Sequence, residues 1–208
     1  MGLIRGAGSF TRYFVNNNLR QNDPDEFLEK ITRFSFQKLD EYSNEERSTG
    51  WVSIMNIFNT DFEDKAFFMH PYIALSWRVD IRKVPRDALK QHCQEAENEI
   101  KQSEELEYLP KDKRKELRDF IWHQLLKRAI PRTHTYDMIW NFDTSILFFG
   151  CTNNKLCDEF AEFFSRTFDI GLSPLSPYSL VYQSLEKDEI NPELLDTIKA
   201  TDFAGGNK

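Results

Sequence analysis

The chain has 208 residues, of which 40% are hydrophobic and 29% are charged. This length and composition are typical of one large or two small globular domains, and they exclude collagen-like, mucin-like and wholly disordered chains. The net charge of −7 argues against the strongly basic domain that usually binds nucleic acid. A local basic face remains compatible with it.

The cysteines and the N-terminus indicate an intracellular protein without metals or disulfides. Cys93, Cys151 and Cys157 are odd in number and have no Cys-x-x-Cys spacing, so we expect reduced thiols and no zinc site. Residues 1–15 contain no apolar stretch long enough for a signal peptide, and no window of the chain is apolar enough to span a membrane. We therefore expect a cytoplasmic protein with no cofactor and no membrane contact.

The first half of the chain predicts a strand, a helix and a longer strand. Residues 10–15 are rich in aromatic and β-branched side chains and predict the first strand. Asp23 and Pro24 predict the start of a helix through Phe34, and residues 37–49 are polar and loop-like. A short apolar segment at 50–52 precedes residues 72–84, whose alternating apolar positions predict a half-buried strand.

Two helices and a strand pair are predicted next. Helical spacing begins at Pro85, and a second helix is predicted over residues 111–128, with Leu117, Phe120, Ile121 and Gln124 on its inner face. The break at 109–110 favours an antiparallel arrangement of the two helices. Strands at 133–142 and 145–149 flank a tight turn and predict a β-hairpin.

The C-terminal part predicts one further Phe-rich helix, capped by Asn153 or Asn154 and ended by Gly171. A last short helix is predicted over 192–201, before a frayed tail. The fold class is therefore α+β, with a mixed or antiparallel sheet, flanking helices and a long antiparallel helical hairpin. We expect one domain over residues 1–177, including the hairpin at 85–128, and an extension over 178–208.

Charge is segregated between the two hairpin helices. Residues 94–107 hold six glutamates and one lysine, a net charge of −5, whereas residues 109–135 hold eight basic and three acidic residues, a net charge of +5. One interpretation is that the helices neutralise each other across the hairpin. The other is that a cationic stripe turns away from Leu117, Phe120 and Ile121 and follows DNA phosphates without reading bases. The stripe consists of Lys111, Arg114, Lys115 and Arg118, with Trp122 beside it as a stacking candidate.

A second basic group lies on the long strand, where Arg78 and Arg82 share one face because side chains alternate. The alternative reading of this group is an ordinary solvated sheet face. Trp51, Trp77 and Trp140 can stack on bases, but burial in a Phe-rich core is the commoner role for such residues.

The order of several short motifs resembles the bacterial recombination-associated RdgC family. The stretch 77–85 runs into a proline-started helix, and a charged connector leads to residues 125–132. There Leu125, Leu126, Arg128, Ala129 and Arg132 match the family's Leu-Leu-Pro-Arg-Ala-Phe-Ser-Arg motif, while Lys127, Ile130 and Pro131 depart from it. The triplet 50–52 matches a Gly-Trp-Val motif, although Ile54 replaces a usual proline, and 138–141 resembles a Trp-Ile-Asp strand. The resemblance covers about residues 10–177.

The resemblance implies ring-shaped dimers that enclose duplex DNA without sequence preference and antagonise RecA filaments. Family members are longer and are often labelled exonucleases. The present chain ends soon after residues 174–177, so we expect a short relative that keeps the core.

The charge pattern and the resemblance together predict a non-catalytic, sequence-independent binder of double-stranded DNA. We expect a nucleoid-associated homodimer that modulates RecA-type recombination. The expected DNA contacts are Lys111, Arg114, Lys115 and Arg118, then Arg78, Arg82, Arg128 and Arg132, with Trp122 for stacking.

Two alternatives remain. In the first, the acidic helix 94–107 docks on a basic protein or imitates nucleic acid. In the second, Pro24-Asp25 and Glu63-Asp64-Lys65 form a magnesium-dependent nuclease site, since such sites need convergent carboxylates and a lysine. Such short patterns recur by chance in acidic chains, and the four histidines are scattered singly, so we rank the nuclease last.

Overall fold

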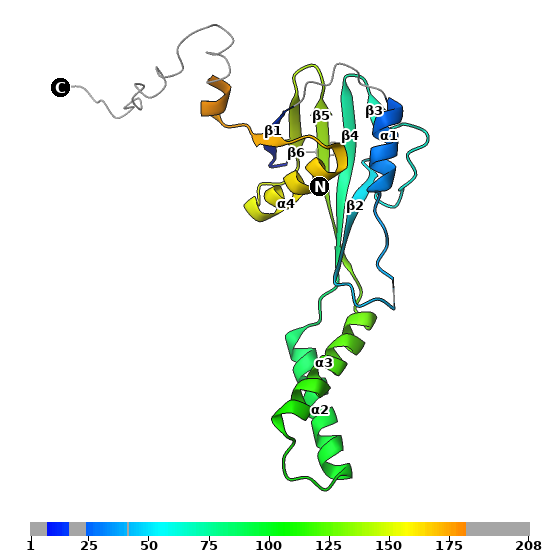
Figure 1. Ribbon diagram of the computed structural model, residues 1–208, viewed down its shortest axis with the longest axis vertical. Helices are drawn as coiled ribbons and strands as arrows, with labels where there is room; N and C mark the ends of the chain where they lie inside the picture. The colour runs from blue at the N-terminus through cyan, green and yellow to red at the C-terminus, as the bar shows by residue number, and fades with distance from the viewer. Residues whose placement is uncertain (1–7, 17–23, 41, 182–208) are drawn as a thin grey trace, which may run out of the picture.

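A single antiparallel sheet with helices on one face forms the body of the protein, and a pair of helices projects from it as an arm (Figure 1). The computed structural model describes residues 8–16, 24–40 and 42–181. The α+β class predicted from the sequence is confirmed. The elements are β1 (Thr11–Val15), α1 (Pro24–Arg33), β2 (Arg47–Ser53), β3 (Phe68–Met69), β4 (Tyr72–Ile81), α2 (Arg86–Ser103), α3 (Lys111–Arg128), β5 (Arg132–Asn141), β6 (Ile146–Phe149), α4 (Asn154–Phe168) and β7 (Leu172–Pro174).

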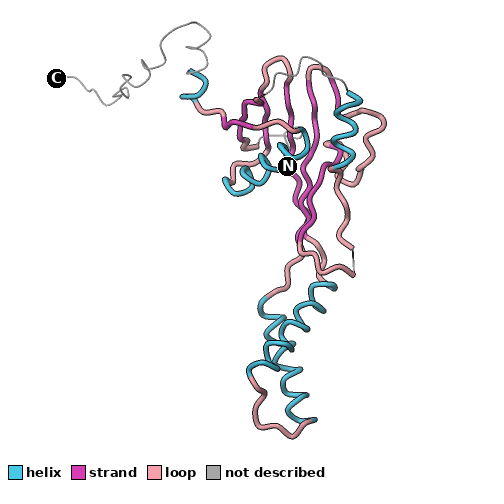
Figure 2. The backbone as a smooth tube through the Cα atoms, viewed as in Figure 1, coloured by secondary structure: helices cyan, strands magenta, loops and turns pink. Residues whose placement is uncertain are grey.

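The sheet has seven strands in the order β2-β4-β5-β6-β1-β7, and β3 pairs with β4 outside this path. Its two longest strands, β4 and β5, are neighbours that pair from Tyr72↔Asn141 to Ile81↔Arg132. The arm is inserted between the ends of these two strands. It therefore projects from one end of the sheet, and Figure 2 shows the chain leaving and re-entering the strands there.

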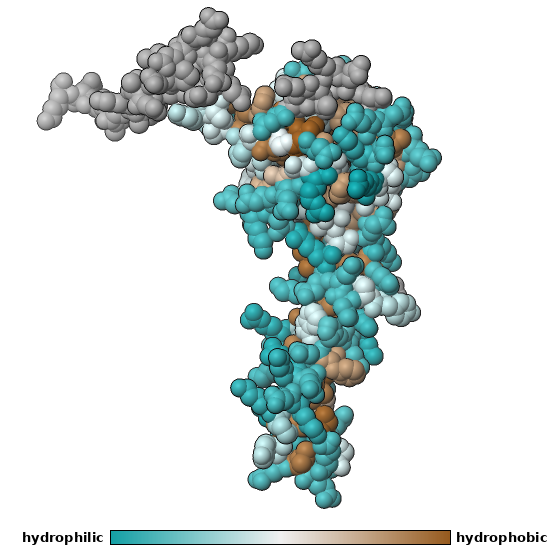
Figure 3. Space-filling view, viewed as in Figure 1, coloured by the Kyte–Doolittle hydropathy of each residue, from teal (hydrophilic) through white to brown (hydrophobic). Residues whose placement is uncertain are grey.

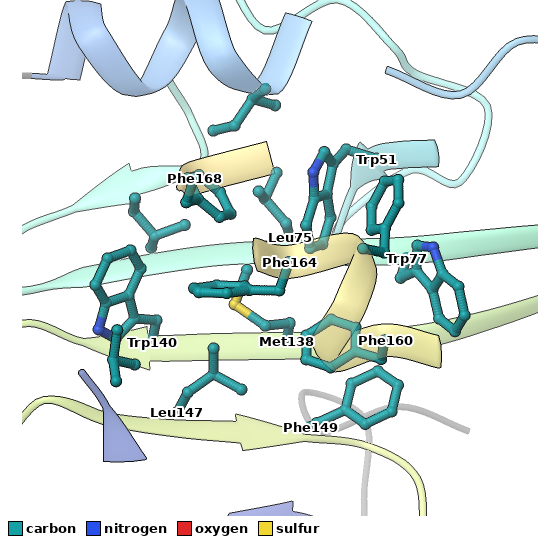
Figure 4. Close-up of a cluster of buried hydrophobic side chains, with 14 of the residues drawn as sticks. Trp51, Leu75, Trp77, Met138, Trp140, Leu147, Phe149, Phe160, Phe164 and Phe168 are labelled. Carbon is teal, nitrogen blue, oxygen red and sulfur yellow. The ribbon is translucent and has the colours of Figure 1, made fainter. Parts of the chain in front are cut away.

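The core lies between the sheet and helices α1 and α4. Alternate residues of β4, including Ile73, Leu75 and Trp77, point toward these helices and are fully buried. Aromatic rings fill the layer (Figure 4). Trp51, Trp77 and Trp140 all lie in it, so the prediction that these tryptophans are core residues is confirmed.

Helix α4 begins and ends by recognisable capping interactions. The Asn153 side chain accepts a hydrogen bond from the backbone N–H of Leu156 at 3.2 Å, as predicted for an N-cap. At the other end, Asp169 adopts the left-handed conformation with φ of 60°. The prediction that Gly171 ends this helix is therefore wrong, because Asp169 tolerates this conformation two residues earlier.

Three strands depart from the sequence prediction. Strand β2 begins at Arg47, inside the segment predicted as a loop, because pairing with β4 orders its polar residues 47–49. Strands β3 and β7 have two and three residues, too few for a detectable alternation. The helix predicted over 192–201 and the Asp23 cap lie outside the described residues.

The arm is formed by α2 and α3, which lie side by side (Figure 1). Ile121 of α3 is buried as predicted, and Leu126 is buried as well. Gln124 and Phe120 are exposed, with 60% of Phe120 accessible. The prediction that these two lie on a buried face is wrong, because α2 covers only part of the apolar surface of α3. No helix in the described part of the chain is long and apolar enough to cross a membrane.

An ion pair between α4 and β2 makes the free energy of unfolding depend on pH. Arg47 donates to Glu159, and this bond keeps the pKa of Glu159 below its ordinary value. A lowered pKa means that the stabilisation is present above the ordinary glutamate pKa and is lost as pH falls through the lower, folded-state value.

We expect Glu159→Gln to reduce the loss of stability between neutral and acidic pH. Thermal unfolding of both proteins across this pH range measures the difference. Glu162→Gln, which changes an exposed neighbour on α4, should leave the pH profile as in the unsubstituted chain. An identical profile for Glu159→Gln would contradict the assignment.

Candidate nucleic-acid interface

A groove of about 770 Å³ runs along the arm between α2 and α3. Leu89 and Cys93 of α2 and Leu117 of α3 are among its lining residues. Its basic residues come from both helices. They are Arg86, Lys90 and Lys101 of α2, and Arg114 and Arg118 of α3.

The groove is cationic although the chain is acidic. Five basic residues face a single carboxylate, Glu97, which gives a net charge of +4. Glu97 is shared between Arg114 at 2.9 Å and Lys101 at 3.3 Å. Within the described residues no ion pair involves Arg86, Lys90 or Arg118, so these three cations remain available to an anionic ligand.

Cys93 adds no negative charge to the groove at neutral pH. Burial raises the pKa of its thiol, and this effect exceeds the lowering by nearby Arg118. A protonated thiol on the wall of the groove leaves the cationic field intact.

The structure divides the predicted stripe on α3. Arg114 and Arg118 line the groove together with Leu117, so the prediction that they turn away from Leu117 is wrong. Residues 114, 117 and 118 share a face because they are three and four positions apart. Lys111 and Lys115 are exposed outside the groove lining.

Trp122 is half-buried, with its ring 4.9 Å from that of His123. It lies on α3 four positions beyond Arg118, one helical turn away. The mutual neutralisation considered for the two helices is partial. Arg114 and Lys113 of α3 pair with Glu97 and Glu104 of the α2 side, whereas in the described part of the chain no ion pair involves Lys111, Lys115 or Arg118.

Arg78 and Arg82, which the sequence predicts as further DNA contacts, lie inside the fold, and the alternative of an ordinary solvated sheet face is wrong. Arg78 makes two hydrogen bonds to Asp80, at 2.7 and 2.8 Å, and its guanidinium stacks on Phe36 at 4.2 Å. Only 3% of Arg82 is exposed, and it donates to the backbone carbonyl of Leu39 at 3.4 Å. Loops that return over this face of β4 cover both residues, since Arg78 donates to the carbonyl of Ile57 and Arg82 to that of Ser43.

Arg128 and Arg132 are exposed near the base of the arm. Arg128 lines a different depression, which also contains Glu95 and Glu99. Arg132 opens β5 opposite Ile81. Neither residue lines the cationic groove.

Arg86, Lys90 and Lys101 line the groove but are not among the DNA contacts that the sequence predicts. Arg86 and Lys90 are four positions apart on α2, and the intervening Leu89 places the same side of the helix near α3. This spacing was a usable signal. The six glutamates of segment 94–107 make the α2 side of the arm look acidic in the sequence. Only Glu97 among them lines the groove, so the basic side of α2 is not apparent from the net charge of the segment.

One pair of the nuclease pattern is brought together. Lys65 contacts Asp25 at 2.6 Å, which joins a loop to α1. Asp64 accepts a hydrogen bond from the backbone N–H of Ala66 at 3.0 Å in a turn of that loop. In the described part of the chain no three His, Cys, Asp or Glu side chains are grouped so that they could hold a metal ion.

A comparison with protein families matches residues 10–187 to the family described as "Putative exonuclease, RdgC". A search of curated proteins finds none that matches the chain. The family match includes the sheet, both covering helices and the entire arm. Because it spans most of the 208 residues, the chain belongs to the RdgC family.

Proposed function

We propose that this protein binds double-stranded DNA without sequence preference and takes part in recombination at the bacterial nucleoid, without catalysing a reaction. The groove between α2 and α3 is the proposed contact surface. It holds DNA phosphates through Arg86, Lys90 and Arg118, with Lys111, Lys115 and Trp122 as an outer flank.

The observation that supports this proposal is a net charge of +4 in one groove of a chain whose net charge is −7. The basic residues of the groove come from both α2 and α3 and are spaced along the length of the arm. Phosphate contacts of this kind give affinity without base readout and make binding depend steeply on salt. Arg114 contributes less, because Glu97 already neutralises it.

The double substitution Lys90→Ala/Arg118→Ala is expected to weaken binding to all duplex sequences by a similar factor. Loss of two phosphate contacts should make the slope of log affinity against log salt shallower by about 2. Fluorescence anisotropy with two duplexes of unrelated sequence, at several salt concentrations, measures both quantities. Both residues are exposed, so the variant should fold normally.

The matched control is Lys38→Ala/Lys155→Ala, which removes two exposed lysines far from the arm in sequence. It should keep the affinity and the salt slope of the unsubstituted protein. Equal losses in both double variants would mean that net charge, and not the groove, governs binding. No change in the Lys90/Arg118 variant would refute the assignment of the site.

The same samples, incubated with Mg²⁺, test the nuclease alternative that the family description keeps open. The proposal expects the DNA to remain intact. Degradation that EDTA stops and Asp25→Asn abolishes would replace the non-catalytic function with a nuclease. Sedimentation of the protein with and without DNA tests the further expectation of a homodimer.

A further inference from the structure

The arm carries a second face that the DNA proposal does not use. On the other side of the contact between α2 and α3, two depressions of about 250 and 350 Å³ adjoin one another. Both are lined by Leu117 and Phe120, so they form one groove centred on these two apolar residues. We call it the Phe120 groove.

Phe120 is an exposed aromatic residue between two hollows. Although 60% of its surface is accessible, it lies beside Ile100 and Leu109 in one depression and Leu125 in the other. An aromatic side chain flanked by such hollows has the form of an interface anchor site, where an apolar side chain of a partner becomes fully buried. Figure 3 shows hydrophobic residues scattered along an arm surface that is otherwise hydrophilic.

The rim of the Phe120 groove is acidic, whereas the cationic groove on the other side of the arm is basic. Four glutamates face two basic residues, which gives a net charge of −2. One of the basic residues, Lys113, is paired with Glu104 at 3.1 Å. The acidic residues of the rim are Glu95, Glu99, Glu104 and Glu116.

This charge selects among the molecules that could cover the groove. Nucleic acid is repelled by an acidic rim. A second copy docked by a two-fold axis would bring the same acidic rim against itself, at a cost in electrostatic repulsion. A basic partner meets no such cost, and its lysines or arginines gain from the glutamates.

We propose that the Phe120 groove docks a basic amphipathic helical segment of another protein. Apolar residues three or four positions apart cover Phe120 and fill the two depressions, and flanking basic residues face Glu95 and Glu99. The arm is then two-sided, and this docking does not depend on DNA binding.

The test uses a fluorescent helical peptide with leucines on one face and lysines on the other, titrated with the full chain. Two further peptides serve as probes of specificity. One has the same composition with the leucine spacing scrambled, and one has glutamates in place of the lysines. Saturable binding of the first peptide, with binding of the other two at least about ten-fold weaker, is the expected result.

Three variants locate the site. Phe120→Ser and Glu95→Lys/Glu99→Lys should each raise the dissociation constant of the lysine peptide by about ten-fold or more. Tyr108→Ser is the matched control, because Tyr108 is 72% exposed on the arm but lines neither depression, and it should bind as the unsubstituted chain does. All these positions are exposed, so folding is not at stake.

Equal affinity for the three peptides, or equal affinity of Phe120→Ser and Tyr108→Ser, would overturn the proposal. Sedimentation of the protein alone tests whether a second copy of the chain occupies the groove instead. If Phe120→Ser dissociates a dimer that Tyr108→Ser preserves, the groove binds a second copy and the proposed basic partner is wrong.

Discussion

Replacing Phe160 with alanine is expected to lower the free energy of unfolding by about 3–5 kcal/mol. Phe160 is fully buried on α4 and stacks on Phe149 of β6, with ring centroids 3.8 Å apart and ring planes at 9°. It also contacts Trp51 and Trp77 at centroid distances of 6.2 and 6.0 Å. The substitution therefore removes contacts with three strands at once, and rigid aromatic neighbours collapse poorly into the resulting cavity.

Urea denaturation followed by far-UV circular dichroism measures this loss. The matched control is Phe120→Ala, which deletes the same atoms from an exposed position on the arm. Its cost should stay within about 0.5 kcal/mol, as for other surface substitutions. Similar losses for the two variants would contradict the placement of the core between α4 and the sheet.

Gly50→Ala is expected to destabilise the protein by about 3 kcal/mol or more, at the upper end of the cost of overpacking. A Cβ atom at Gly50 would lie 2.3 Å from the Cα and 2.4 Å from the backbone nitrogen of Phe36. The two segments cannot easily separate. The N–H of Phe36 donates to the carbonyl of Trp51 at 2.9 Å, and the N–H of Trp51 donates to the carbonyl of Phe34 at 3.0 Å.

The clash involves backbone, so no change of side-chain rotamer relieves it. Gly8→Ala is the control, because a Cβ atom there meets nothing within 4 Å. This second variant should be neutral or stabilised by up to about 1 kcal/mol. Thermal unfolding of both variants makes the comparison. Equal melting temperatures would show that segment 34–36 does not pack closely against Gly50 of β2.

The motifs that carry the family resemblance mostly form the framework. Gly50 permits the close approach of segment 34–36. Trp51 and Val52 are fully buried, as is Leu126 at the base of the arm. Arg128 and Ala129, in the same motif, lie in the last turn of α3 and at its C-cap. The proposed binding surfaces lie on the arm, mainly outside these motifs.

Most elements were predictable because their signals are local. The 3.6-residue period marks α1 and α4, and the alternation of apolar side chains marks β4 as a strand, although the fold buries both of its faces and not one as predicted. Helix α3 begins and ends at the predicted residues, since Pro110 lies just before it and the chain turns extended at Ala129. Short strands such as β7 carry no comparable signal, because three residues do not reveal a period.

The candidate site was less predictable, because exposure depends on segments far apart in the sequence. Arg78 and Arg118 are both basic residues on regular elements, and nothing local distinguishes them. Phe36 and Asp80 enclose Arg78 in the fold, whereas Arg118 lines an open groove.

The sequence by itself determined the α+β class, the main elements, the family and the presence of opposite charges in the arm. Only the tertiary structure decided on which side of the arm each charge lies. The side that a residue faces depends on which residues of α2 and α3 touch, and that contact places Arg118 and Glu99 on opposite sides of the arm. Helical periodicity determines which side chains share a face of one helix. The packing of two helices determines which of those faces stay exposed to a ligand.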